Sequence, residues 1–119
     1  MLFLPCAERK GTAYFEFQYC KKDWSAKKLL QMGYKFWESD SLLVYIDDEE
    51  KFFSDYQKYL KLPDGKSEVD PFGINYYSKK HANNILKRIL EEKPIDWEIF
   101  AKWLGKAASE YNGFFFLGI

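Results

Sequence analysis

The stretch YNGFFFLGI, residues 111–119, decides the fold that this sequence predicts. Asn112 and Gly113 both tolerate a positive φ, so we expect them to end the helix that precedes them. The residues that follow, 114–119, carry no charge and are too few for another helix. A continuous apolar run of this length beside turn residues is typical of a strand buried on both faces. We therefore expect 114–119 to lie inside a sheet, between two strands from earlier in the chain.

The rest of the chain alternates strand-like and helix-like patterns. Earlier strands are predicted at residues 13–20, 41–47 and 73–77. Helices are predicted, from apolar side chains at helical spacing, at residues 25–36, 47–60, 78–93 and 96–111. Asp47 with Glu50 forms a capping-box pattern, Ser78 and Asp96 are expected to begin the last two helices, and Pro94 separates these helices. The sequence therefore predicts an α+β fold, in which helices pack on a small, mainly antiparallel sheet of four or five strands. Residues 1–119 are expected to form a single domain.

The composition favours a folded protein, because 47% of the residues are hydrophobic and 20% are aromatic.

No apolar run approaches the roughly 18 residues that a bilayer span requires. The opening residues, MLFLPCAERKGT, have no basic leader before their apolar part, so we expect no secretion signal and a cytoplasmic location. If residues 2–6 and 13–19 pair as a hairpin, Cys6 and Cys20 lie too far apart for a disulfide and are expected as reduced thiols.

The charges sum to zero but are unevenly distributed. Residues 1–35 hold seven Lys or Arg and three Asp or Glu, residues 36–70 hold four and ten, and residues 71–119 hold seven and five. The middle third is therefore an acidic block. Such a block disfavours direct binding of nucleic acid, because phosphate contacts require a concentrated positive surface, and it is compatible with a basic protein partner.

Motifs that would indicate an enzyme are few. The sequence contains no GxGxxG motif, no phosphate loop and no zinc-type spacing, so we expect no cofactor, no metal and no catalytic residues. Ser78, Lys79 and His81 at a helix start could bind a phosphate, although a solvated first turn explains them as well. The acids at 47–50 could form a metal or acid/base cluster, but their interaction with a helix dipole needs no ligand. Bases could stack on the aromatic side chains of 76–77 and 114–116, although core packing is the better account because these segments contain no cations.

The last third of the chain resembles small bacterial immunity proteins, which protect cells against polymorphic toxins, including those of contact-dependent growth inhibition. The matching pieces are the helix before Lys93–Pro94, the helix start at Asp96–Trp97, the sequence Tyr111–Asn112–Gly113, and residues 116–119, FLGI. The resemblance covers about a third of the chain, and residues 1–70 show no match to the pattern.

The resemblance implies a cytoplasmic, non-enzymatic inhibitor. Such a protein binds the C-terminal domain of one cognate toxin in a 1:1 complex and blocks its active site or an essential surface. Many of these toxins are nucleases with a basic working face, which an acidic patch would attract. The acidic side chains available for such a patch are Asp47, Asp48, Glu49, Glu50, Asp55, Asp64, Glu68 and Asp70. The aromatic side chains that could serve as hot spots beside it are Trp24, Tyr34, Trp37 and Tyr56. All of these residues lie outside the matching region.

Two alternative functions stay open at this point. One is an RNA- or nucleotide-binding enzyme that uses the helix start around His81. The other is a non-catalytic interaction domain that forms homodimers through an aromatic surface.

Overall fold

The computed structural model describes residues 1–21, 37–62 and 67–118. The predicted helix at 25–36 therefore lies outside the described residues, as do Trp24, Tyr34 and Asp64. The strands are β1 (Leu4–Pro5), β2 (Tyr14–Tyr19), β3 (Leu42–Tyr45), β4 (Ile74–Tyr77) and β5 (Phe114–Leu117). The α-helices are α2 (Glu49–Tyr56), α3 (Lys79–Glu92) and α4 (Trp97–Ser109), and short 3₁₀ helices are η1 (Cys6–Glu8), η2 (Ile46–Asp48) and η3 (Gln57–Tyr59).

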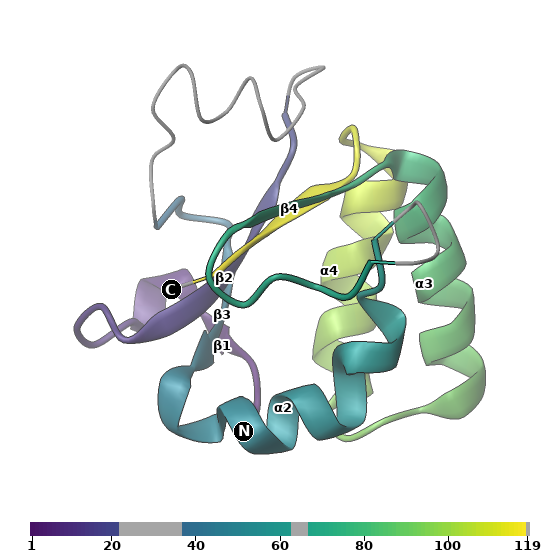
Figure 1. Ribbon diagram of the computed structural model, residues 1–119. Coiled ribbons are helices and arrows are strands. Elements are labelled where there is room, and N and C mark those ends of the chain that lie inside the picture. The colour runs from purple at the N-terminus through teal and green to yellow at the C-terminus, as the bar shows by residue number, and fades with distance from the viewer. Residues whose placement is uncertain (22–36, 63–66, 119) are drawn as a thin grey trace.

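The five strands form one antiparallel sheet in the order β1-β3-β2-β5-β4. The last strand, β5, lies between β2 and β4, with Phe116 opposite Phe17 on one side and Asn75 on the other. Figure 1 shows α3 and α4 side by side in opposite directions beside the sheet, while α2 crosses below them. The α+β class, the antiparallel sheet and the buried C-terminal strand are therefore as the sequence predicts.

Burial of β5 explains why its sequence is apolar throughout. Phe114 and Phe116 belong to the main core, which the helices share. Phe115 and Leu117 belong to a smaller cluster on the opposite face, together with Cys20. All four side chains of β5 are at most 1% exposed. A strand whose two faces are both covered cannot alternate polar and apolar residues, so the continuous run is required by its position.

Phe17 lies at the centre of the main core. Its ring centroid is 4.9 Å from those of Phe100 and Phe116, and 5.9 Å from those of Phe52 and Trp103. These partners come from α2, α4 and β5, so one residue of β2 contacts most of the layers of the fold. Clustered rings at such distances add edge-to-face and stacking energy to the area that they bury.

The two ends of α3 lie where the sequence predicts them. The backbone N–H of His81 donates to the Ser78 hydroxyl (3.1 Å), which confirms Ser78 as the N-cap of α3. Lys93 adopts a left-handed conformation (φ 48°) before Pro94, as expected of a residue that cannot remain helical. Asp96 precedes α4 but makes no capping bond with its side chain. Its Oδ2 instead accepts from the Leu2 N–H (2.8 Å) and ties the first residues to the start of α4.

One expectation and one assumption are wrong. The capping box of Asp47 and Glu50 does not form, because η2 takes up residue 47 and α2 begins only at Glu49, after an Asp48 N-cap that makes no side-chain bond. The hairpin of 2–6 with 13–19 does not form either, because β1 pairs with β3. Both edges of β2 are occupied by the longer strands β3 and β5, which bury more apolar surface than the two-residue β1 could.

Cys6 is half-buried in η1, and Cys20 is buried just after β2. Among the described residues, none of the helices combines the length and the apolar character that crossing a bilayer requires.

Candidate functional site

The four consecutive acids at residues 47–50, here called the acidic segment, lie where β3 passes into α2. Asp47, Glu49 and Glu50 are exposed, and Asp48 is half-buried. The carboxylates gather around the start of α2, where the partial positive charge of the helix dipole favours them. The end of β3 and the start of α2 therefore hold a concentrated negative charge at the surface.

No basic side chain among the described residues neutralises this segment. The ion pairs found there are Lys21–Asp40, Lys58–Glu92, Lys61–Glu68 and Arg88–Glu92. None of them includes a residue of the acidic segment. Its charge is thus available to attract a positive partner over distances of about a Debye length, roughly 8 Å at physiological salt.

Aromatic rings line the sheet next to the acidic segment. Tyr45, the last residue of β3, lies opposite Tyr14 in the register, and their ring centroids are 5.4 Å apart. The Tyr14 ring is 6.2 Å from that of Trp37, and the Arg9 guanidinium lies 4.8 Å above the Trp37 ring. We call Trp37, Tyr14 and Tyr45 the aromatic row. It brings the predicted hot-spot residue Trp37 to the same end of β3 as the acidic segment.

Tyr45 is the member of the aromatic row that offers most surface, with 40% of it exposed. The Asp47 carboxylate, together with partial desolvation and a hydrogen bond to Asp47, raises the pKa of the Tyr45 hydroxyl. The Tyr45 hydroxyl therefore keeps its proton at physiological pH, and its hydrogen bond to Asp47 links the aromatic row to the acidic segment. A hollow of about 360 Å³ opens beside it. The residues that line this hollow are Met1, Leu2, Leu4, Lys10, Tyr14 and Tyr45.

The other predicted acids that the structure describes, Asp55, Glu68 and Asp70, lie apart from the acidic segment in the chain. Asp55 is half-buried near the end of α2. Glu68 is exposed and lies 3.8 Å from the Lys61 ammonium. The Asp70 carboxylate accepts from the Phe72 N–H (2.9 Å) and so closes a turn before β4. These contacts account for Glu68 and Asp70 without a partner.

Tyr56 cannot be a surface hot spot, and this part of the prediction is wrong. The side chain is fully buried, and its hydroxyl donates to the Ile95 carbonyl (2.5 Å). Its ring packs 5.1 Å from that of Phe3 and 5.5 Å from that of Phe100. The helical spacing of aromatic residues in α2 marks the face that enters the core, and Tyr56 lies on that face.

The alternative site at the start of α3 is occupied by structural contacts. The Nε2 atom of His81 lies 3.1 Å from the Lys61 carbonyl oxygen, and its ring stacks on Tyr77 (5.5 Å between centroids). The Ser78 hydroxyl is engaged by the His81 N–H. Of the rings that could have stacked on bases, those of Tyr77 and residues 114–116 are buried, which confirms core packing for them. The Tyr76 ring is half-buried and packs against the smaller cluster of Phe115 and Leu117. Within residues 1–21, 37–62 and 67–118, no three His, Cys, Asp or Glu side chains converge to hold a metal ion.

Tyr14 and Tyr45 belong to the site but were not among the residues predicted for it. Both were assigned to strands, but nothing local shows that these strands pair with each other. The antiparallel register places the two rings opposite each other. The position of Tyr45 directly before the acidic segment was the one available signal.

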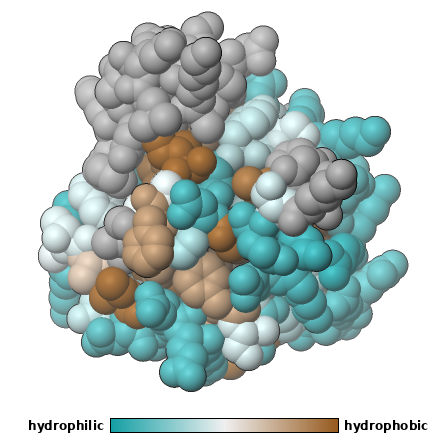
Figure 2. Space-filling model, in the orientation of Figure 1, coloured by the Kyte–Doolittle hydropathy of each residue, from teal (hydrophilic) through white to brown (hydrophobic). Residues whose placement is uncertain are grey.

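Figure 2 shows one face of the molecule, where hydrophilic residues cover much of the surface and hydrophobic residues gather near the centre of the view. Comparison of the chain with protein-family models, with curated proteins and with solved structures finds no match.

Proposed function

We propose that this chain is an immunity protein that binds the C-terminal domain of a cognate bacterial toxin, in a 1:1 complex, and blocks its active site or an essential surface. The observation that carries this proposal is the acidic segment, whose four carboxylates have no cationic partner among the described residues and lie beside the exposed ring of Tyr45. The resemblance to immunity proteins supports the same function. The protein would act in the cytoplasm, without turnover, and without contacting nucleic acid or membrane.

The partner that fits this surface has a basic face. A nuclease must attract phosphate, so its working surface carries Lys and Arg side chains. The acidic segment would steer the encounter with such a surface, and Tyr45 and Trp37 would supply apolar contact once the two proteins meet. We therefore propose that the toxin is a nuclease and that the acidic segment faces its active site.

The test uses the toxin domain encoded by the gene immediately upstream of this one. Wild-type protein should restore growth to cells that express the domain and should bind it in a calorimeter. Affinity should fall as NaCl rises from about 50 to about 300 mM, because exposed charges are screened. If the domain cleaves RNA or DNA, addition of this protein should stop the cleavage.

Two matched variants separate the acidic segment from net charge. The test variant neutralises the segment with Asp47→Asn, Asp48→Asn, Glu49→Gln and Glu50→Gln. The control variant makes the same change in charge elsewhere, at exposed positions, with Glu8→Gln, Glu91→Gln, Glu98→Gln and Glu110→Gln. The test variant should bind at least about tenfold more weakly, mainly through a slower association rate, whereas the control should bind like wild type. Equal binding by the test variant and wild type would remove the acidic segment from the interface, and failure of the wild type to bind or protect would end the proposal.

A further inference from the structure

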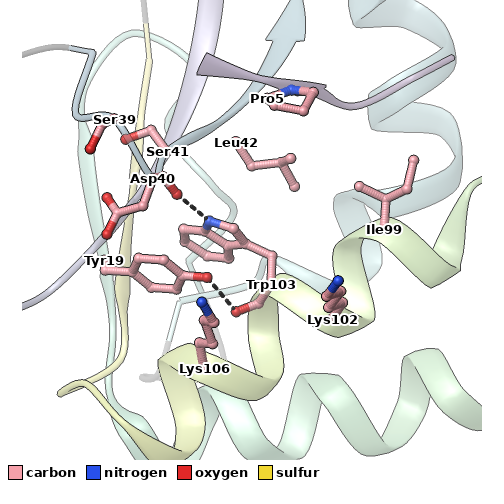
Figure 3. Close-up of a pocket in the computed structure, with 10 residues that line it drawn as sticks. All are labelled: Pro5, Tyr19, Ser39, Asp40, Ser41, Leu42, Ile99, Lys102, Trp103 and Lys106. Carbon is pink, nitrogen blue, oxygen red and sulfur yellow. Dashed lines mark hydrogen bonds between the residues drawn. The ribbon is translucent and has the colours of Figure 1, made fainter. Parts of the chain in front are cut away.

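A second feature of the surface lies on the helix side of the sheet, at the end of β3 away from the acidic segment. It is a cavity of about 240 Å³ between α4 and the segment that leads into β3, and we call it the α4 cavity. Its apolar lining includes Pro5, Leu42, Ile99 and Trp103, and Lys102 and Lys106 also border it. Figure 3 shows both lysines projecting from α4 and Leu42 and Ile99 facing each other across the space.

The walls of the α4 cavity are fixed by hydrogen bonds. The indole Nε1–H of Trp103 donates to the Asp40 carbonyl (2.9 Å), and the Tyr19 hydroxyl donates to the Trp103 carbonyl (3.0 Å). The rings of Tyr19 and Trp103 stack with centroids 4.1 Å apart. Because these side chains are held by their own partners, a ligand would enter a preformed site and would lose little affinity to ordering it.

The charge at the cavity is positive. Lys102 and Lys106 are exposed, lie one turn apart on α4, and take part in none of the ion pairs found among the described residues. The acid among the lining residues, Asp40, is paired with Lys21 (2.9 Å), and its carboxylate points away from Leu42 and Ile99 in Figure 3. Two like charges at this spacing repel each other on a helix. An anion between them would relieve this repulsion and would also accept charge-assisted hydrogen bonds from both ammonium groups.

The size of the cavity limits what can enter it. Pockets for drug-sized ligands measure roughly 300–1,000 Å³, so about 240 Å³ suits a molecule built on one ring and does not suit a peptide helix or strand. We propose that the α4 cavity binds a small organic anion, in which a carboxylate or a phosphate monoester is attached to an apolar body of about one ring. The anion contacts the Lys102 and Lys106 ammonium groups, and the apolar body lies against Ile99, Leu42 and the edge of Trp103.

The experiment titrates isotope-labelled protein with phenylacetate and with phenyl phosphate, and follows the Trp103 indole N–H and the Ile99 amide by NMR. Inorganic phosphate and acetate test the anion without the ring, and 2-phenylethanol tests the ring without the charge. Both aromatic anions should give saturable shifts at these two residues, at concentrations at least about tenfold lower than any of the three partial probes. Comparison of phenylacetate with phenyl phosphate identifies which anionic group the lysines prefer.

A matched pair of variants tests the role of the two lysines. Lys102→Gln with Lys106→Gln should weaken both aromatic anions at least about tenfold, whereas Lys80→Gln with Lys87→Gln, an equal change in charge at exposed positions of α3, should leave both affinities unchanged. Absence of saturable shifts at Trp103 and Ile99 would overturn the proposal. So would equal binding to the Lys102/Lys106 variant, or equally tight binding of inorganic phosphate. None of these measurements involves a toxin, so their failure leaves the proposed immunity function standing.

Discussion

Gly113 is a position where a single methyl group should be costly. Its φ is 86°, and an added Cβ would overlap the Tyr77 carbonyl oxygen and lie 2.6 Å from the Ser78 carbonyl carbon. We expect Gly113→Ala to lower the free energy of unfolding by about 2–3 kcal/mol, from backbone strain and the clash together. Urea denaturation measures the change.

The matched control is Gly105→Ala, because Gly105 is in α4 and a Cβ there would meet no atom within 4 Å. This substitution should raise the free energy of unfolding by about 0.5–1 kcal/mol, since Ala is the better helix former. If both substitutions destabilise equally, the conformation of Gly113 is not the cause.

Glu16 is a buried carboxylate whose role is to hold the segment before β3. It is 1% exposed and accepts from the Trp37 N–H (3.0 Å), the Ser41 hydroxyl (2.6 Å) and the Gln18 amide (3.1 Å). Gln at this position would turn an N–H₂ group toward these donors. Glu16→Gln should therefore cost about 2–4 kcal/mol in urea unfolding, while Glu8→Gln at an exposed position should change stability by less than about 0.5 kcal/mol. A Glu16→Gln protein as stable as wild type would show that the carboxylate is dispensable.

Single residues were predictable where local chemistry decides the outcome. Ser78 as a cap and Lys93 as an exit depend on their immediate neighbours, and both are as predicted. Asp47 failed as a cap because the 3₁₀ turn of η2 delays the helix. Asp96 makes its bond with Leu2, 94 positions earlier in the chain, which no local pattern indicates.

At the scale of elements, all four residues of β5 are buried, and the strand pairs on both of its edges. Phe116 is fully buried, and its ring is 4.9 Å from that of Phe17 and 5.6 Å from that of Phe15. Phe116→Ala should lower the free energy of unfolding by about 3–5 kcal/mol, because it opens a cavity that the surrounding rings cannot close. Phe72→Ala removes the same side chain at a position that is 82% exposed, and should change stability by less than about 0.5 kcal/mol. Thermal unfolding followed by circular dichroism separates the two, and similar losses would contradict the central position of β5.

The positions of the strands were predicted well from the spacing of apolar residues and from the turn residues between them. The pairing of the strands was predicted less well. The strands predicted at 13–20, 41–47, 73–77 and 114–119 appear as β2, β3, β4 and β5 with slightly shorter bounds. The apolar run of β5 also indicated its interior place. The two-residue β1 was assigned the wrong partner, because pairing depends on which strands compete for an edge and not on any pattern inside the strand.

At the scale of the whole molecule, buried tyrosines should make the fold sensitive to alkali. Burial, as the largest cause, raises the pKa of Tyr19, Tyr56 and Tyr77 above the usual value of about 10. In the unfolded chain these hydroxyls ionise near pH 10, whereas in the folded protein they keep their protons. The stability that they contribute is therefore fully present below about pH 10 and is lost as the pH rises above it.

Three tyrosines that release protons on unfolding give a slope of about 4 kcal/mol per pH unit above pH 10. Urea unfolding at several pH values between about 9 and 11.5 measures this slope. Tyr77→Phe removes one of the three groups and should reduce the slope by about a third, whatever it does to stability at neutral pH. An unchanged slope in this variant would mean that Tyr77 does not contribute.

The candidate site was predictable only where it depends on a local pattern in the sequence. Four consecutive acids stand out in any sequence, and the structure places them on the surface. Their neighbours Tyr14 and Tyr45 meet only through pairing of strands that are distant in sequence. The α4 cavity is likewise formed by β2, β3 and α4 together, so it cannot be predicted from the sequence of any single segment.

The central place of β5 has a consequence for how the protein is made. While a ribosome is still translating the first 113 residues, β2 and β4 each lack a neighbour and Phe17 lacks two of its ring contacts. Until β5 is made, the nascent chain exposes apolar surface between β2 and β4, and we expect chaperones to bind it during that interval. The sheet and the main core can therefore be completed only after residues 114–117 have emerged from the ribosome.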